Sequence, residues 1–126
     1  MEAAPPPHPY MPPEGVSLMS EAILDIAVER YRQIEVEGWL PEDDDTVFSG
    51  TLARMGGCYA IHVSNFFNLD EISAESLRDY REEPMSEVWP GARCPWKPSY
   101  PRRDLVKAAA LILAEIERID RRGSWQ

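Results

Sequence analysis

The chain has 126 residues, of which 44% are apolar, and this suits one domain with one hydrophobic core. Its longest apolar run, residues 108–114, is too short to span a membrane, and its net charge of −9 argues against binding duplex nucleic acid along a broad surface. Cys58 and Cys94 have no metal-binding spacing, so we expect reduced thiols in a cytoplasmic protein.

The charge is distributed unevenly along the chain. Residues 1–90 contain 5 Arg and no Lys against 18 acidic residues, which gives −13. Residues 91–126 contain 8 basic residues against 4 acidic ones, which gives +4. An acidic body with one small basic zone suits a small anionic ligand better than a polymer.

The chain begins with a proline-rich stretch. Six prolines within residues 1–16 predict an extended or disordered arm over residues 1–18, followed by a single helical domain over residues 19–126. The first helix is expected from Ser20 to Glu37, capped by Ser17 or Ser20 and ended by Gly38. Helical spacing predicts a buried face of Ile23, Leu24, Ile26, Ala27, Tyr31 and Ile34. The expected polar positions are Glu29, Arg30, Arg32, Gln33, Glu35 and Glu37.

The second helix is expected from Thr51 to Asn65. Gly56 and Gly57 in its middle each cost about 1 kcal/mol relative to alanine, which we attribute to close helix packing. His62 follows Cys58 by four residues and shares its helix face. The pair is either a Cys–His nucleophile or, as we favour, a histidine packed beside a core thiol.

The third helix is expected from Ser73 to about Arg81, and a proline-broken loop rich in aromatic rings follows over residues 88–100. The last helix is expected from Pro101 to about Arg122. Its apolar residues 108–114 predict the central helix of the domain. Its main polar stripe is Asp104, Lys107, Glu115 and Arg118, interrupted by Leu111. The predicted fold is an all-α bundle of three to four helices with an extended proline-rich N-terminal arm.

Cations and aromatic rings gather before and within the first turns of the last helix. Helix N–H groups, arginine and lysine bind phosphate, and flat rings stack on bases. The alternative is that the tryptophans fill a small core and the cations balance an acidic body. The predicted ligand-binding residues are Trp39, Trp89, Trp96, Lys97, Arg102, Arg103 and Lys107.

Carboxylates gather at the end of the first helix and in the acidic loop after it. The loop acids are either solvated, cap the next helix, or hold a divalent metal. A metal-dependent nucleotide pyrophosphohydrolase needs several carboxylates around Mg²⁺. The spacing of the helical glutamates does not place a pair on one helix face. The candidate ligands under this enzyme alternative are Glu35, Glu37, Asp44 and Asp45.

Most of residues 22–122 resembles a group of small, largely uncharacterised phage and prophage proteins. The motifs that carry the resemblance are ERYRQ (29–33), EGWLPEDDD (37–45), KP (97–98), RRDLVKA (102–108) and EIER (115–118). Asp43 departs from the histidine expected there. Gly38-Trp39 followed by Asp44-Asp45 is also similar to the ryanodine-receptor repeat domain, a helical module thought to bind nucleotide-like ligands.

The all-helical MazG-like nucleotide pyrophosphohydrolases are a further similarity. Residues 117–120 fit the ExxD part of their motif, but no EExxE precedes it. The first hypothesis is therefore a phage-type protein, in the cytoplasm of an infected or lysogenic bacterium. It would bind a nucleotide or nucleotide-derived signal without turning it over and without a cofactor. Sequestering such a signal would serve an anti-defence role.

The second hypothesis is a Mg²⁺-dependent MazG-like (d)NTP pyrophosphohydrolase. The third is an adaptor whose tryptophans form a subunit interface. We expect no duplex nucleic-acid partner and no membrane partner. We also expect a homo-oligomer, because a few short helices leave apolar faces to cover.

Overall fold

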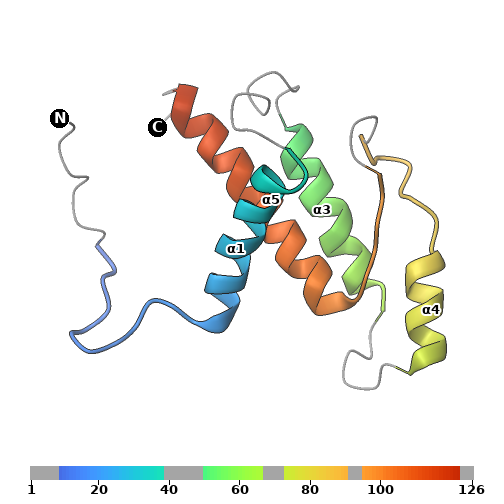
Figure 1. Cartoon of the computed structure of the whole chain (residues 1–126), viewed down its shortest axis with the longest axis horizontal. Coiled ribbons are helices and arrows are strands. Elements are labelled where there is room, and N and C mark those ends of the chain that lie inside the picture. Colours follow the sequence, from blue (N-terminus) through green and yellow to red (C-terminus); the bar gives the residue numbers. More distant parts are fainter. Residues whose placement is uncertain (1–8, 39–49, 67–72, 91–94, 123–126) are drawn as a thin grey trace.

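Helix α5 is the centre of the fold. The computed structural model describes residues 9–38, 50–66, 73–90 and 95–122. Within these ranges the protein is all-α, without strands, as predicted, and its helices are α1 (Glu21–Glu35), α3 (Thr51–Ser64), α4 (Ala74–Glu82) and α5 (Pro101–Arg122). Both α1 and α3 pack against α5 (Figure 1), which confirms α5 as the central helix. Residues 9–20 form no helix or strand and lead away from the bundle.

Local capping signals set the helix boundaries. Ser20 caps α1 by accepting a hydrogen bond of 3.2 Å from the Ile23 N–H. Ser73 and Ser76 form a capping box at the start of α4. Helix α5 begins with a proline, which has no backbone N–H. This costs the helix no hydrogen bond, because an N–H in the first turn has no intrahelical acceptor. Because such signals lie within a few residues of the boundary, the four expected helices agree with the observed ones to within two residues.

The hydrophobic core lies mainly between α3 and α5. Gly56 allows the two helices to approach closely, since a Cβ atom there would lie 2.9 Å from the Ala108 carbonyl oxygen and 3.0 Å from Cγ1 of Ile112. This confirms the packing interpretation for Gly56, whereas a Cβ atom at Gly57 would meet nothing within 4 Å. The buried core residues are Leu52, Met55, Cys58, Tyr59, Trp89, Ala108, Leu111 and Ala114.

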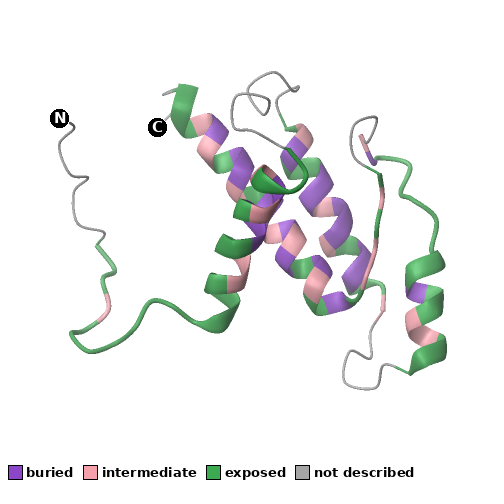
Figure 2. Ribbon diagram, viewed as in Figure 1, coloured by how far each residue is buried: buried purple, intermediate pink, exposed green. Residues whose placement is uncertain are grey.

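Helix α1 is rotated away from the predicted orientation, and of its predicted buried face Ile26 and Ile34 are only partly buried. Leu24 and Tyr31, expected in the core, are 52% and 63% exposed, and Figure 2 shows the outer surface of α1 as largely exposed. Glu29, Arg30 and Gln33, expected in solvent, are buried instead. The inner face of α1 is therefore largely polar, and several of its large apolar side chains are exposed.

The physical reason is that α5 offers charged partners to α1. Nη2 of Arg103 contacts Glu29, and Nε of Arg30 lies 2.9 Å from Oε1 of Glu117. Paired charges can be buried at far lower cost than isolated ones. The polar stripe of α5 also faces inward, because Asp104, Glu115 and Arg118 are all buried. No helix among the described residues is long and apolar enough to cross a membrane.

Candidate ligand-binding pocket

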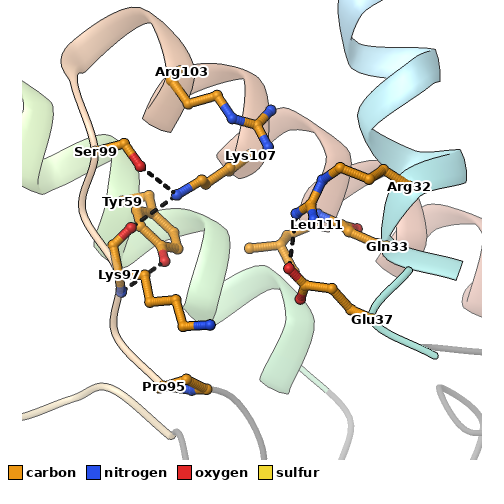
Figure 3. Close-up of a pocket in the computed structure, with 10 residues that line it drawn as sticks. All are labelled: Arg32, Gln33, Glu37, Tyr59, Pro95, Lys97, Ser99, Arg103, Lys107 and Leu111. Carbon is orange, nitrogen blue, oxygen red and sulfur yellow. Dashed lines mark hydrogen bonds and ion pairs between the residues drawn. The ribbon is translucent and has the colours of Figure 1, made fainter. Parts of the chain in front are cut away.

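A pocket of about 170 Å³ lies beside the first half of α5, where α1, α3 and the segment 95–100 meet it (Figure 3). Residues from α1 form one side of the pocket and the segment 95–100 forms the opposite side, with α3 and α5 behind. Most of the lining side chains are polar or charged. They are Arg32, Gln33, Glu37, Tyr59, Pro95, Lys97, Ser99, Arg103, Lys107 and Leu111.

The backbone of Lys97 is fixed from two sides. Its N–H donates a hydrogen bond of 3.2 Å to the hydroxyl oxygen of Tyr59. Its carbonyl oxygen accepts a hydrogen bond of 2.8 Å from Nζ of Lys107, which also donates to Oγ of Ser99 at 3.1 Å. The segment 95–100 is therefore tied to both α3 and α5, and the side chain of Lys97 starts from a fixed point.

Asp104 of α5 also holds the segment 95–100 in place. Its carboxylate is fully buried and accepts hydrogen bonds from the Ser99 N–H, at 3.1 Å to each oxygen, and from the hydroxyl of Tyr80. Burial raises the pKa of Tyr80 far above its usual range, and the hydrogen bond to Asp104 raises it further. Burial lowers the pKa of Lys107, whereas the negative charge of Asp104, 3.4 Å from its Nζ, acts in the opposite direction. Asp104 thus joins the pocket to α4 through Tyr80.

Glu29 joins two of the pocket's cations. It is 1% exposed, and it accepts hydrogen bonds from Nε of Arg32 at 2.7 and 3.0 Å and from Nη2 of Arg103 at 2.9 Å. Nη2 of Arg32 also donates to Glu37 at 2.8 Å. Burial acts to lower the pKa of Arg32, but the hydrogen bonds to these two glutamates raise it overall, so the guanidinium stays charged.

The pocket therefore carries an excess of positive lining groups. Arg32, Lys97, Arg103 and Lys107 face one lining carboxylate, Glu37. Glu29 and Asp104 lie behind the wall and neutralise part of the charge of the two arginines and Lys107. Within the described ranges, no residue forms a hydrogen bond or ion pair with Nζ of Lys97.

The structure brings together three of the predicted ligand-binding residues, Lys97, Arg103 and Lys107. Arg102 lies outside the pocket, because its Nη2 contacts Oδ2 of Asp25 at 2.9 Å on the exposed surface. The helical turn separates neighbouring residues by about 100°, so Arg102 and Arg103 project in different directions.

Trp89 and Trp96 do not line the pocket. They pack with Tyr59 in an aromatic cluster, in which Trp96 stacks on Tyr59 with 4.6 Å between ring centroids. The cluster continues through His62, whose Nε2 lies 2.9 Å from the Tyr80 carbonyl oxygen. This arrangement supports the core-filling interpretation of the two tryptophans and the packing interpretation of His62.

The candidate metal ligands are only partly within the described residues. Glu35 is exposed at the end of α1, and Glu37 is paired with Arg32. Trp39, Asp44, Asp45 and Cys94 lie outside the described residues. Across residues 9–38, 50–66, 73–90 and 95–122, no group of three or more His, Cys, Asp or Glu residues is placed to hold a metal ion.

The sequence analysis did not identify Arg32, Gln33, Tyr59 and Ser99 as site residues. Helical periodicity placed Arg32 and Gln33 on the solvent side, because it assumes that polar residues point outward. Both residues lie within ERYRQ (29–33), a motif on which the expected resemblance to phage proteins rests, and this is the one sequence signal that includes them. Comparisons with protein-family models, curated proteins and solved structures found no match to this chain.

Proposed function

We propose that the protein binds the phosphate-bearing end of a small ligand of the nucleotide class in this pocket. The observation that carries the proposal is the convergence of four cations from three segments, α1, the segment 95–100 and α5. One guanidinium group can bind two phosphate oxygens at once, and a lysine amine binds phosphate as a point charge. Lys97 supplies the amine that no carboxylate of the described residues neutralises.

The size of the pocket supports binding of one end of a nucleotide. A volume of about 170 Å³ is below the roughly 300–1,000 Å³ of pockets that enclose drug-sized ligands. The ring of Tyr59 is stacked on Trp96, and Nζ of Lys107 lies 5.3 Å from its centroid. Because Trp96 and Lys107 already contact the ring of Tyr59, a base cannot stack on it. The base would then extend beyond the pocket, and the phosphate would lie inside it.

Binding without turnover would suit a protein that sequesters a nucleotide signal, the role implied by the resemblance to phage proteins. The enzyme alternative would need carboxylates converging on Mg²⁺. The side chain of Glu37 is instead held by Arg32. The assay below separates the two, because only the enzyme would consume its ligand.

The test is isothermal titration of pyrophosphate, ADP and ATP into the purified protein, with and without Mg²⁺, followed by chromatography of the recovered ligand. We expect at least one of the three to bind and to be recovered intact. Lys97→Gln should weaken binding at least about fivefold, in line with about 1 kcal/mol or more for a charge-assisted contact. Arg54→Gln removes a positive charge from an exposed site on α3 that does not line the pocket, and it should leave binding unchanged.

Three results would contradict the proposal. The first is that no phosphate compound binds. The second is that Lys97→Gln and Arg54→Gln bind as tightly as the wild type. The third is consumption of the ligand in the presence of Mg²⁺. That result would favour the pyrophosphohydrolase over the binding protein.

A further inference from the structure

Gln33 is a buried polar side chain in the wall of a charged pocket. It is 3% exposed and lies on α1 beside Arg32. Two charged side chains of the same wall have hydrogen-bond partners: Arg32 donates to two glutamates, and Lys107 donates to two oxygen atoms. Among the described residues, the side-chain oxygen of Gln33 has no hydrogen-bond partner.

A buried acceptor without a donor is costly. Leaving such a group unsatisfied costs about 1–3 kcal/mol, and most buried polar side-chain atoms in folded proteins are paired. The buried carboxylate on the same face of α1 is paired, since Glu29 accepts hydrogen bonds from Arg32 and Arg103. An acceptor kept unpaired in a pocket wall is typical of a residue that binds a donor on the ligand.

We infer that Gln33 determines specificity by accepting a hydrogen bond from a hydroxyl group of the ligand, and that the ligand is therefore a hydroxyl-bearing phosphate ester such as the sugar–phosphate end of a nucleotide. This inference rests on the proposed phosphate-binding function and narrows its ligand class. A bare phosphate or pyrophosphate can donate to Gln33 only through a P–OH group, which it loses as it ionises, whereas an alcohol hydroxyl keeps its proton.

The charges of the pocket favour a hydroxyl over an amine as the donor. An aliphatic amine on the ligand would be protonated at neutral pH, and Arg32, Lys97, Arg103 and Lys107 would repel it. A hydroxyl group is neutral and donates one hydrogen bond. The sugar directly joined to the phosphate also fits the limited volume better than a base does.

The test compares two phosphate esters with the same three-carbon chain, glycerol 3-phosphate and propyl phosphate, by isothermal titration. Only glycerol 3-phosphate has alcohol hydroxyl groups. We expect the wild type to bind glycerol 3-phosphate about tenfold or more tightly than propyl phosphate, since sites built to bond a hydroxyl discriminate against analogues without it. Gln33→Met keeps the length of the side chain but removes the acceptor, and it should bind the two esters equally.

Two further measurements separate recognition from a structural role. Gln33→Met should melt at the same temperature as the wild type or higher, because it removes an unsatisfied buried group. Gln33→Glu keeps an acceptor and should retain the preference for glycerol 3-phosphate, while both esters bind more weakly beside the new negative charge. Arg54→Gln, the matched surface control, should leave the ratio of the two affinities unchanged.

The outcomes distinguish this inference from the proposed function. Equal binding of both esters by the wild type would overturn the role of Gln33 and leave phosphate binding intact. A preference for glycerol 3-phosphate that persists in Gln33→Met, with a lowered melting temperature, would assign Gln33 a structural role and also overturn the inference. Binding of neither ester would count against the phosphate pocket itself.

Discussion

Arg103 and Glu29 lie 74 residues apart in the sequence and form the contact that joins the pocket to the inner face of α1. Nη2 of Arg103 lies 2.6 Å from Oε2 of Glu29, and the same carboxylate accepts hydrogen bonds from Arg32. A buried carboxylate held by two guanidinium groups is compensated for its loss of hydration. The wall of the pocket and the packing of α1 on α5 therefore depend on the same ion-pair cluster.

Removing the positive charge of Arg103 should destabilise the fold. We expect Arg103→Gln to lower the free energy of unfolding by about 1–3 kcal/mol, because Glu29 would keep only Arg32 as a cationic partner. The neighbouring substitution Arg102→Gln breaks an exposed ion pair with Asp25 and should cost about 0–1 kcal/mol. Urea unfolding of the two variants measures the difference. Equal losses would show that the buried cluster contributes no more than a surface pair.

The two adjacent glycines of α3 should respond in opposite directions to alanine. Gly56→Ala places a Cβ atom 2.9 Å from the backbone oxygen of Ala108, so α3 and α5 must separate, and we expect a loss of about 1–3 kcal/mol. Gly57→Ala meets no atom within 4 Å and should gain about 0.5–1 kcal/mol from helix propensity. Thermal unfolding of both variants tests this, and a stable Gly56→Ala variant would contradict the close approach of the helices.

The helices could be predicted from the sequence because their signals are local. Ser20, Ser73 and Pro101 mark helix starts within a few residues of themselves, and the apolar run 108–114 indicates the central helix. The orientation of α1 could not be predicted in this way. Its buried Glu29 and Arg30 depend on partners in α5, Arg103 and Glu117, and a single sequence does not show which distant charges will pair.

The candidate site was predictable in part for the same reason. Lys97, Arg103 and Lys107 could be grouped because they are near one another in the sequence, around the start of α5. Arg32 and Gln33 enter the pocket only because α1 crosses α5 with its polar side inward. The tryptophans were grouped with the cations on proximity in sequence, but Tyr59 of α3 draws Trp96 into the aromatic cluster.

The hydrogen bond between Tyr80 and Asp104 should give the stability of the protein a distinct pH dependence. The pKa of Tyr80 is raised above its ordinary value of 10.0, chiefly by burial, so the folded state keeps a proton that the unfolded chain loses above about pH 10. The stabilisation from this group is therefore fully present below pH 10 and is lost as the pH rises above it.

Tyr80→Phe isolates this effect from the other titrating groups. At pH 8 the wild type should be more stable than the variant by about 1–2 kcal/mol, as expected for a buried hydrogen bond to a carboxylate. At pH 11 the difference should shrink by about 1.4 kcal/mol, the equivalent of one pH unit. Urea unfolding at the two pH values measures it. A difference independent of pH would mean that Tyr80 titrates alike in the folded and unfolded chains.

The homo-oligomer expected from the sequence remains a prediction, and the outer face of α1 is where we expect the contact. Leu24, Val28 and Tyr31 follow one another at helical spacing on that face and are 52%, 58% and 63% exposed. Contiguous exposed apolar patches commonly mark interaction sites, and such a patch on one helix can meet the same patch of a second copy across a two-fold axis.

Light scattering during size-exclusion chromatography tests this contact. The wild type should have at least twice the monomer mass, and Val28→Asp should lower the mass to that of a monomer. Met85→Glu introduces a charge at a comparably exposed apolar position after α4 and should leave the mass unchanged. A monomeric wild type over the accessible range of concentration would contradict the prediction.

The phosphate pocket is tested most directly by NMR. A titration of ¹⁵N-labelled protein with pyrophosphate, followed in ¹H–¹⁵N spectra, reports the position of a bound anion residue by residue. We predict saturable shifts of the backbone amides of Lys97 and Ser99 and of Nε–H of Arg103, all of which belong to the pocket. No saturable shift, or shifts confined to the basic end of α5 at Arg121 and Arg122, would contradict a phosphate site between α1 and α5.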